Sequence, residues 1–347
     1  MLVDSPPEPR AETAPAPSTP WAIRAVGLLA SVLILALVAS ASIAIGAKQL
    51  SPAQVWHGLL HDSGTYADVV VGDRLSRTVL GLLAGAALGL SGAVLQALTR
   101  NPLADPGLLG INAGASAAVV TAITYLGVTS LSGYVWFALL GAAAVGALVW
   151  FLGGSRGATP VRLALAGTAI SAALYGYLQA VMITDDAALG RMRLWTIGSL
   201  ASATDATIAQ VLPFLLAGTV LALALARPLN AVAMGDDTAR ALGARLDRTR
   251  ALALAAATVL CGAATAACGP IVFVGLMVPH VVRSFTGPDL RWILPYATVL
   301  APVLLLGADV IGRIVARPAE LQVGIVTAVI GGPVFILLVR RRRTAQL

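Results

Sequence analysis

The sequence predicts an all-α polytopic membrane protein with about ten transmembrane helices, and three observations carry this prediction. Of the 347 residues, 58% are hydrophobic and only 11% are charged, whereas a soluble domain typically carries about 25% charged residues. The apolar residues gather in stretches of about 20, the length that an α-helix needs to cross a bilayer. These stretches are too long and too uniformly apolar for barrel strands, so the helix is the only structure that satisfies their backbone in lipid.

The expected order of elements begins with a tail. Residues 1–20 are rich in proline and hold no apolar run, which predicts a disordered cytoplasmic tail before a membrane domain at 21–343. The first apolar stretch, from Trp21, is longer than the core of a secretory signal and is expected to stay. The third and eighth stretches depart most from the pattern, because one holds Asn112 and the other is short. The ten predicted spans are 21–46, 75–98, 108–128, 133–153, 161–183, 207–226, 251–268, 271–285, 292–312 and 323–339.

The basic residues predict the orientation. With ten spans both termini share one side of the membrane, and Lys and Arg accumulate in cytoplasmic loops. Most of the 23 basic residues fall on the side of the termini, so both termini are expected on the cytoplasmic side. The protein itself is expected in a bacterial cell membrane. The arginines are scattered over many loops instead of forming one patch, so the pI near 10.1 does not indicate nucleic-acid binding. The expected outer segments carry Lys48, Arg74, Arg77, Arg191, Arg193, Arg313 and Arg317.

Several kinds of chemistry are absent from the sequence. Lys48 is the only lysine and Gln49 follows it, so the chain lacks the G-x-x-x-x-G-K-S/T loop with which many ATPases cradle phosphates. Its three histidines do not form a cluster with metal-ligand spacing. No nucleophile–base arrangement stands out, so no catalytic residue, metal site or enzymatic activity is predicted. Cys261 and Cys268, seven residues apart on one predicted helix, lie too far apart for a disulfide and are expected to pack between helices.

One acidic residue lies inside a predicted span. Asp309 could serve a carrier driven by protons or sodium, because such carriers place ionisable groups near mid-membrane. Arg313 follows four residues later on the same helix face and is well placed to neutralise it. The pair lies near the outer end of its span, which favours a structural or docking role over a proton relay. The chain then has no energy source of its own, and an autonomous ion-coupled carrier remains the alternative.

A polar segment at 227–250 interrupts the apolar pattern. Pro228 is suited to begin a short helix and Gly235 to end it. Asp236 or Asp237 can cap a second short helix, which Gly243 would stop. The segment is too polar for the membrane and too apolar for a free linker. Two short helices on the cytoplasmic face are predicted, and an amphipathic loop lying on the inner leaflet is the alternative.

This segment resembles the coupling helices of FecCD-type permeases, which are membrane subunits of type II ABC importers for iron-siderophore, haem and cobalamin. The family shows an A-L-G-E-x-x-A-x-x-L-G pattern, from which this chain departs conservatively at Met234 and Asp236. The resemblance covers about 21–343 and leaves 1–20 without a counterpart. It also rests on RLSRTVLGLLAGAALGLSGAVLQALTRNPLADPGLLG, VRLALAG, GPIVFVGLMVPHVVRSFTGPDLRWILP and ADVIGRIVARPAELQVGIVTAVIGGPVFILLVRR.

The resemblance implies the type II importer permease fold and several partners. The subunit would work in pairs, as a homodimer or with a homologue, and an extracytoplasmic substrate-binding protein would dock outside. Two cytoplasmic ATPases, which use ATP and Mg, would supply the energy, so this chain itself would bind no cofactor. They would dock on coupling helices at about 228–243. The implied coupling residues are Met234, Gly235, Asp236, Asp237, Ala239, Arg240, Leu242 and Gly243.

The resemblance also implies roles at the outer face and along the pathway. In relatives, outer arginines pair with glutamates of the binding protein, and the matching positions are Arg74, Arg77 and Arg313. Arginines that snorkel to lipid headgroups are the alternative. The spans at 161–183 and 323–339 would line the pathway, with an inner gate at Thr159 and Pro160, although relatives carry small hydroxyl residues where Pro160 stands. Ferric siderophore, haem and cobalamin remain open as substrates, and ferric siderophore is the commonest of the three.

Overall fold

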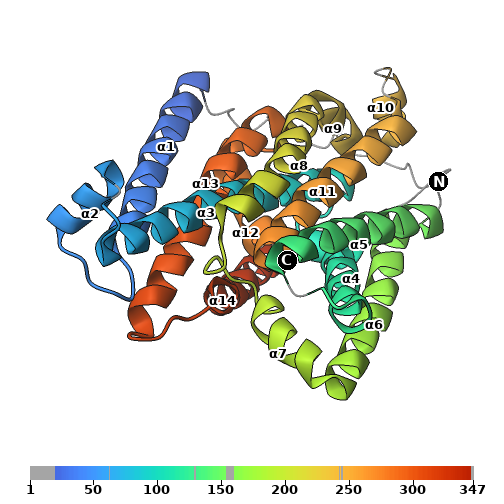
Figure 1. Ribbon diagram of the computed structural model, residues 1–347. Helices are drawn as coiled ribbons and strands as arrows, with labels where there is room; N and C mark the ends of the chain where they lie inside the picture. The colour runs from blue at the N-terminus through green and yellow to red at the C-terminus, as the bar shows by residue number, and fades with distance from the viewer. Residues whose placement is uncertain are drawn as a thin grey trace, which may run out of the picture.

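The computed structural model describes residues 20–61, 63–128, 130–153, 160–241, 243 and 245–344. Within these residues every regular element is a helix (Figure 1). The α-helices are α1 (Trp21–Ala44), α2 (Pro52–Leu60), α3 (Tyr66–Leu98), α4 (Ile111–Leu126), α5 (Leu131–Leu152), α6 (Pro160–Thr184), α7 (Asp186–Trp195), α8 (Asp205–Ala224), α9 (Ala226–Ala233), α10 (Asp236–Ala241), α11 (Leu246–Cys268), α12 (Val274–Thr286), α13 (Leu290–Val315) and α14 (Val323–Thr344), with a 3-10 helix η1 at Pro106–Leu109.

The predicted all-α class is confirmed, and each of the ten predicted spans coincides with a helix. Among the described residues, seven helices are long and apolar enough to cross a membrane: α1, α3, α5, α6, α8, α11 and α13. The remaining three positions hold α4, α12 and the apolar part of α14, Val323–Leu337, which are shorter. Glycines shorten two of them, since α4 ends at Gly127 and α12 ends at Gly287, both with positive φ.

Helix α3 lies at the centre of the bundle and contacts α11, α12 and α13 (Figure 1). The sequence predicts close helix packing at the stripe of Gly81, Gly85 and Gly89, and the structure confirms it. A Cβ atom on Gly85 would lie 2.6 Å from the Cα atom of Pro302 in α13, and one on Gly89 would lie 2.6 Å from the Cβ atom of Ala301. Small residues therefore let the two helix backbones approach closely.

Two helices outside the predicted spans flank the bundle. Helix α2 begins with a capping box, in which the Ser51 hydroxyl accepts from Gln54 N–H and the Gln54 side chain accepts from Ser51 N–H. Helix α7 follows α6 and is capped by Asp185, whose carboxylate accepts hydrogen bonds from the N–H groups of Ala187 and Ala188. Both helices are too short to span a membrane and too polar to show the apolar runs on which the span prediction rests.

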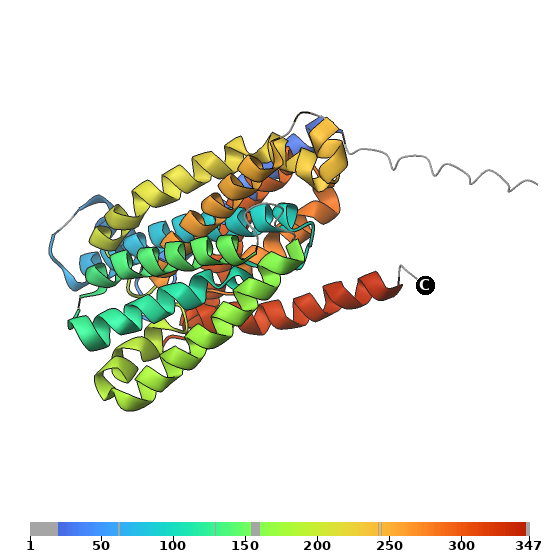
Figure 2. The ribbon, with the colours of Figure 1, turned by 90° about the vertical axis from the view of Figure 1, so that its right-hand side faces the viewer.

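The bundle has two distinct ends (Figure 2). Helices α9 and α10 lie at the same end as the end of α14, and α2 lies at the opposite end. The start of α1 is near the start of α13, because the Trp21 and Trp292 rings lie 6.3 Å apart between centroids. Both ends of the helical region thus lie at the α9–α10 end, as an even number of crossings requires. The side of the membrane on which that end lies stays a prediction.

Candidate functional site

The segment that resembles the coupling helices folds as two short helices. Helix α9 ends before Gly235, whose φ of +111° is open to glycine, and α10 ends just before Gly243, which has a φ of +77°. The two predicted helix ends are therefore confirmed. Pro228 is the third residue of α9 and not the first, because α9 starts at Ala226 directly after α8. Leu242 lies outside the described residues.

A small apolar core holds the two helices together. Val232 of α9, Ala239 of α10 and Leu246 of α11 are buried against one another. Met234, between α9 and α10, is 65% exposed, and the Arg240 side chain is also 65% exposed. The segment is thus a folded unit with its own core and an outward face, instead of a loop. Arg240 pairs with the fully exposed Asp237 at 3.3 Å, a surface contact that adds little stability.

Asp236 faces inward from the first turn of α10. Its oxygens accept hydrogen bonds from Arg250 Nη2 at 2.8 and 2.9 Å, and Arg100 beyond the end of α3 forms a second ion pair. Partial burial acts to raise the pKa of Asp236, but the bonds and charge of Arg250 and the charge of Arg100 outweigh it and lower the pKa. The sequence suggests Asp236 as a possible helix cap, and the family resemblance implies a coupling role for it. In the structure its carboxylate ties α10 to α11 and α3.

Helix α9 is also joined to the start of α13. The Asn230 amide donates to Asp289 Oδ1 at 2.7 Å, and its oxygen accepts from the Leu290 N–H at 2.9 Å. Hydrogen bonds from Arg291, with smaller help from Asn230, lower the pKa of Asp289 to about 2. This link could not be predicted from the sequence, because 59 residues separate its partners. Side-chain hydrogen bonds therefore join α9 to the start of α13.

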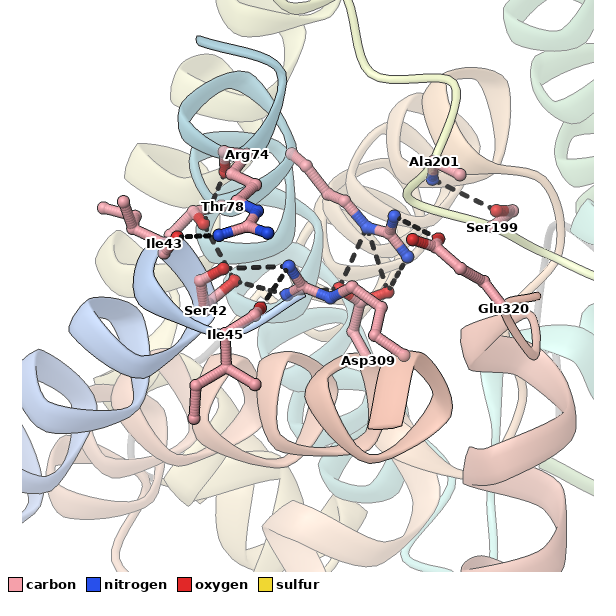
Figure 3. A network of polar contacts seen from close by, with 11 residues as sticks. Ser42, Ile43, Ile45, Arg74, Thr78, Ser199, Ala201, Asp309 and Glu320 are labelled. Atoms are coloured by element: carbon pink, nitrogen blue, oxygen red, sulfur yellow. Dashed lines mark hydrogen bonds and ion pairs between the residues drawn. The ribbon is translucent and has the colours of Figure 1, made fainter. Parts of the chain in front are cut away.

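At the opposite end of the bundle, Arg77 of α3 and Arg313 of α13 share the carboxylate of Asp309, which Figure 3 labels together with Arg74 and Glu320. Arg77 donates from Nε and Nη2 to Asp309 at 2.7–3.2 Å, and Arg313 Nη2 lies 2.9 Å from Asp309 Oδ2. Arg77 Nη1 donates to Glu320 Oε2 at 2.6 Å. The predicted Asp309–Arg313 pair is confirmed. We call Arg74, Arg77, Asp309, Arg313 and Glu320 the arginine network.

The last turn of α1 completes this network with backbone acceptors (Figure 3). Arg74 donates to the carbonyls of Ile43, Ala44 and Lys48, at 2.6–3.1 Å. Arg313 donates to the carbonyls of Ser42 and Ile45 and to the Ser42 hydroxyl, at 2.8–3.0 Å. Carbonyls at the end of a helix, as at residues 42–45, have no partner within the helix and are natural acceptors for a guanidinium group. The Lys48 carbonyl lies in the segment that follows α1.

The structure therefore brings the three predicted docking arginines together but buries them. Arg74 is 6% exposed, Arg77 9% and Arg313 1%. The sequence predicts guanidinium groups displayed to a partner or to lipid headgroups, and it does not indicate the contacts of Arg77 with Asp309 and Glu320. These partners lie more than 200 residues away in the chain. Their docking role stays a prediction, and in this conformation it requires access through the cavity beside the network.

That cavity has a volume of about 470 Å³ and is open to the outside of the bundle. The side chains of Asp73 and Glu320 and the three arginines line it, together with the turn at 201–204 before α8. Among the carboxylates of the network, Asp309 is fully buried and the Glu320 side chain is 34% exposed. Cations thus outnumber anions around a water-accessible hollow, an arrangement that suits an acidic group.

The predicted pathway helices carry large exposed apolar residues. On α6, Val161, Leu165 and Ile183 are 66–82% exposed, and on α14, Val329 and Ile336 are 58–67% exposed. Thr159 of the predicted gate lies outside the described residues, and Pro160 is the first residue of α6.

The histidines and cysteines of the described part of the chain lie apart from one another, except for two neighbouring histidines. No group of three or more His, Cys, Asp or Glu residues is placed to hold a metal ion there. His57 and His61 stack at the end of α2, with ring centroids 5.0 Å apart, and His57 contacts the Ser63 hydroxyl at 3.0 Å. Cys261 and Cys268 are free and buried, as expected for packing residues.

Comparison with known proteins identifies the family. A family model described as the FecCD transport family matches residues 32–341. The chain is 46% identical to the ferric enterobactin transport system permease protein FepD of Escherichia coli (strain K12), over 92% of this chain and 96% of that protein. It is 37% identical to the hemin transport system permease protein HmuU of Yersinia pestis, over 90% of this chain and 94% of that protein.

A solved structure supports the same assignment. A chain described as an inward-facing conformation of a metal-chelate type ABC transporter matches with a TM-score of 0.81 and 28% identity, over 91% of this chain and 99% of that one. The sequence, the helical bundle and its relatives agree that this protein is a membrane-spanning transport subunit. The chain belongs to the FecCD transport family and is a permease subunit of an ABC importer.

Proposed function

We propose that the chain is the permease of an ATP-driven importer for ferric siderophores. The observation that carries this proposal is its 46% identity, over nearly the full length of both chains, to a ferric enterobactin permease. A probable siderophore permease of Bacillus subtilis is a further relative, at 35% identity. Haem and cobalamin are the second candidates, because permeases named for them match at 37% and 38%.

In this proposal the α9–α10 segment is the docking site of a cytoplasmic ATPase. Exposed Met234 and Arg240 give it an apolar centre with a charged rim, which suits a protein interface. Asp236 and Asn230 connect it to α11, α3 and α13. Two ATPases would bind a pair of permeases and hydrolyse ATP with Mg, and their movement would reach the membrane helices through these contacts. No cofactor would be bound by this chain.

The remaining partners follow from the other surfaces. A second permease, identical or homologous, would cover the exposed apolar faces of α6 and α14, and substrate would pass between the two subunits. A substrate-binding protein would dock at the arginine network, with acidic side chains reaching into the adjoining cavity. Transport would then be by alternating access, with α9 and α10 in the bacterial cytoplasm. The buried Asp309, held by Arg77 and Arg313, favours this proposal over an autonomous ion-coupled carrier.

Uptake into proteoliposomes tests the proposal. The permease would be reconstituted with its ATPase and its binding protein, and uptake of an iron-55-labelled ferric siderophore, haem and cobalamin would be compared. We expect ATP-dependent uptake, with the siderophore preferred by about tenfold or more, the margin that about 1.4 kcal/mol of differential binding gives. Preferred uptake of haem or cobalamin would refute the substrate. Uptake by the permease alone, driven by a proton or sodium gradient, would refute the importer mechanism.

A further inference from the structure

Each of the three side-chain nitrogens of Arg77 already donates to a carboxylate within the chain. Nε and Nη2 bind Asp309, and Nη1 binds Glu320. The two carboxylates differ in setting, because Asp309 is fully buried in α13 whereas the Glu320 side chain is 34% exposed and lines the cavity. An acidic side chain that enters this cavity therefore meets a guanidinium group whose outward-facing bond is taken by Glu320.

The charges of the network make Glu320 the replaceable member. Asp309 serves Arg77 and Arg313 together, and its removal would strand two buried cations. Glu320 makes one hydrogen bond, to Arg77, while its side chain stays partly open to water. It acts on Arg74 and Arg313 only through its charge. Exchange of Glu320 for another carboxylate keeps the charge and the hydrogen bond of Arg77 and returns Glu320 to solvent. Such an exchange costs far less than leaving Arg77 without a partner.

We propose that Glu320 acts as an internal stand-in for an acidic side chain of the docking protein, and that docking displaces it from Arg77. The inference rests on the proposed docking at the arginine network and adds a step to it. Before docking, Glu320 keeps Arg77 neutralised and oriented. On docking, the incoming carboxylate accepts the hydrogen bond of Arg77 Nη1, and the Glu320 carboxylate moves into water.

The position of Glu320 connects this exchange with α14. The segment 316–322 joins α13 to α14, and the Leu321 N–H bonds the Gly312 carbonyl at 3.2 Å. In the first turn of α14, the Gly324 N–H bonds the Gly198 carbonyl at 3.1 Å. The Arg77–Glu320 ion pair connects the segment 316–322 to α3. Displacement of Glu320 therefore loosens the segment 316–322, which leads into the proposed pathway helix α14. Docking outside would in this way change the contacts at the start of α14.

A comparison of two charge-removing variants tests the inference. Glu320→Gln removes the negative charge that competes with an incoming carboxylate for Arg77. Asp73→Asn is the matched control. Asp73 also lines the cavity, is exposed, and forms no ion pair within the described part of the chain. Both variants remove one negative charge from the same rim. Binding of the cognate substrate-binding protein to the complete transporter in nanodiscs would be measured by biolayer interferometry at low and physiological salt.

We expect Glu320→Gln to tighten docking about three- to tenfold, and Asp73→Asn to change it less than about twofold. Hydrogen exchange of residues 316–324 should also rise in Glu320→Gln and, on docking, in the unmodified transporter. Glu320→Ala, which also removes the acceptor, should tighten docking at least as much.

Other outcomes would overturn the inference. Equal effects of Glu320→Gln and Asp73→Asn would show that Glu320 affects docking only through its negative charge and not by competing for Arg77. Unchanged or weaker docking, or misfolding of both Glu320 variants, would make the pair a structural contact only. These outcomes leave the docking site itself intact, since the unmodified transporter still binds its partner. If the unmodified transporter binds no substrate-binding protein, the docking proposal fails first.

Discussion

Asp309 is the residue on which one end of the molecule is organised. Its carboxylate is fully buried and binds the guanidinium groups of Arg77 and Arg313, which are themselves almost fully buried. A proton relay needs a carboxyl group that exchanges its proton with a pathway, whereas both oxygens of the buried Asp309 carboxylate are bound by arginines. Asp309 is therefore a shared counter-ion. Its neutralisation should be felt as lost stability.

We expect Asp309→Asn to destabilise the protein by roughly 3–5 kcal/mol, because breaking a buried pair leaves uncompensated charge behind. Thermal unfolding of the detergent-solubilised permease would measure this loss. Asp73→Asn, on the exposed rim of the same cavity, should stay within about 0.5 kcal/mol of the unmodified protein. Asp309 would instead be a relay if the unmodified permease alone showed gradient-driven uptake and an Asp309→Asn variant, as stable as this control, lost that uptake.

At the scale of elements, local signals predicted what depends on local chemistry. Gly235 and Gly243 predicted the ends of α9 and α10, because both adopt positive φ values. The apolar runs predicted the long helices, but α3 starts at Tyr66, well before the expected residue 75, since Asp68, Asp73 and Arg74 interrupt the apolar pattern of its first turns, which pack near α2. The partners of Arg77 and Asp236 could not be predicted, because tertiary packing of distant helices brings them together.

Close contact between α3 and α12 rests on a glycine that the predicted stripe did not include. A Cβ on Gly92 would lie 1.8 Å from the Gly275 carbonyl oxygen, which is backbone and cannot turn aside. Gly72, on the same helix, has no atom within 4 Å of a built Cβ and is exposed. The two positions therefore separate the effect of helix packing from the effect of glycine on the helix itself.

We expect Gly92→Ala to destabilise the bundle by about 1–3 kcal/mol or more, the usual cost of overpacking. Gly72→Ala should be neutral or stabilising by up to about 1 kcal/mol, because alanine favours the helix. Melting temperatures of the two purified variants would make the comparison. If Gly92→Ala has the same melting temperature as Gly72→Ala, α3 and α12 separate readily and their close approach does not stabilise the fold.

For the whole molecule, the main feature is a pair of polar ends joined by one helix. The stretch of α3 from Arg77 to Leu98 measures about 30 Å, at about 1.5 Å per residue, which is the thickness of the hydrocarbon core of a bilayer. One end carries the arginine network, and at the other Arg100 follows α3 and holds Asp236 of α10. Helix α3 thus connects the proposed docking site of the binding protein with that of the ATPase.

The central claim is that ATP hydrolysis drives transport through α9 and α10, and Met234 allows the most direct test. ATP-driven siderophore uptake would be measured in proteoliposomes with Met234→Asp and with the conservative control Met234→Leu. Met234 is 65% exposed, so neither change should disturb the fold. We predict that Met234→Leu transports normally and that Met234→Asp loses about tenfold or more of its uptake, because a buried unpaired charge at an interface costs several kcal/mol. Full ATP-driven uptake by Met234→Asp would contradict the coupling role of this segment.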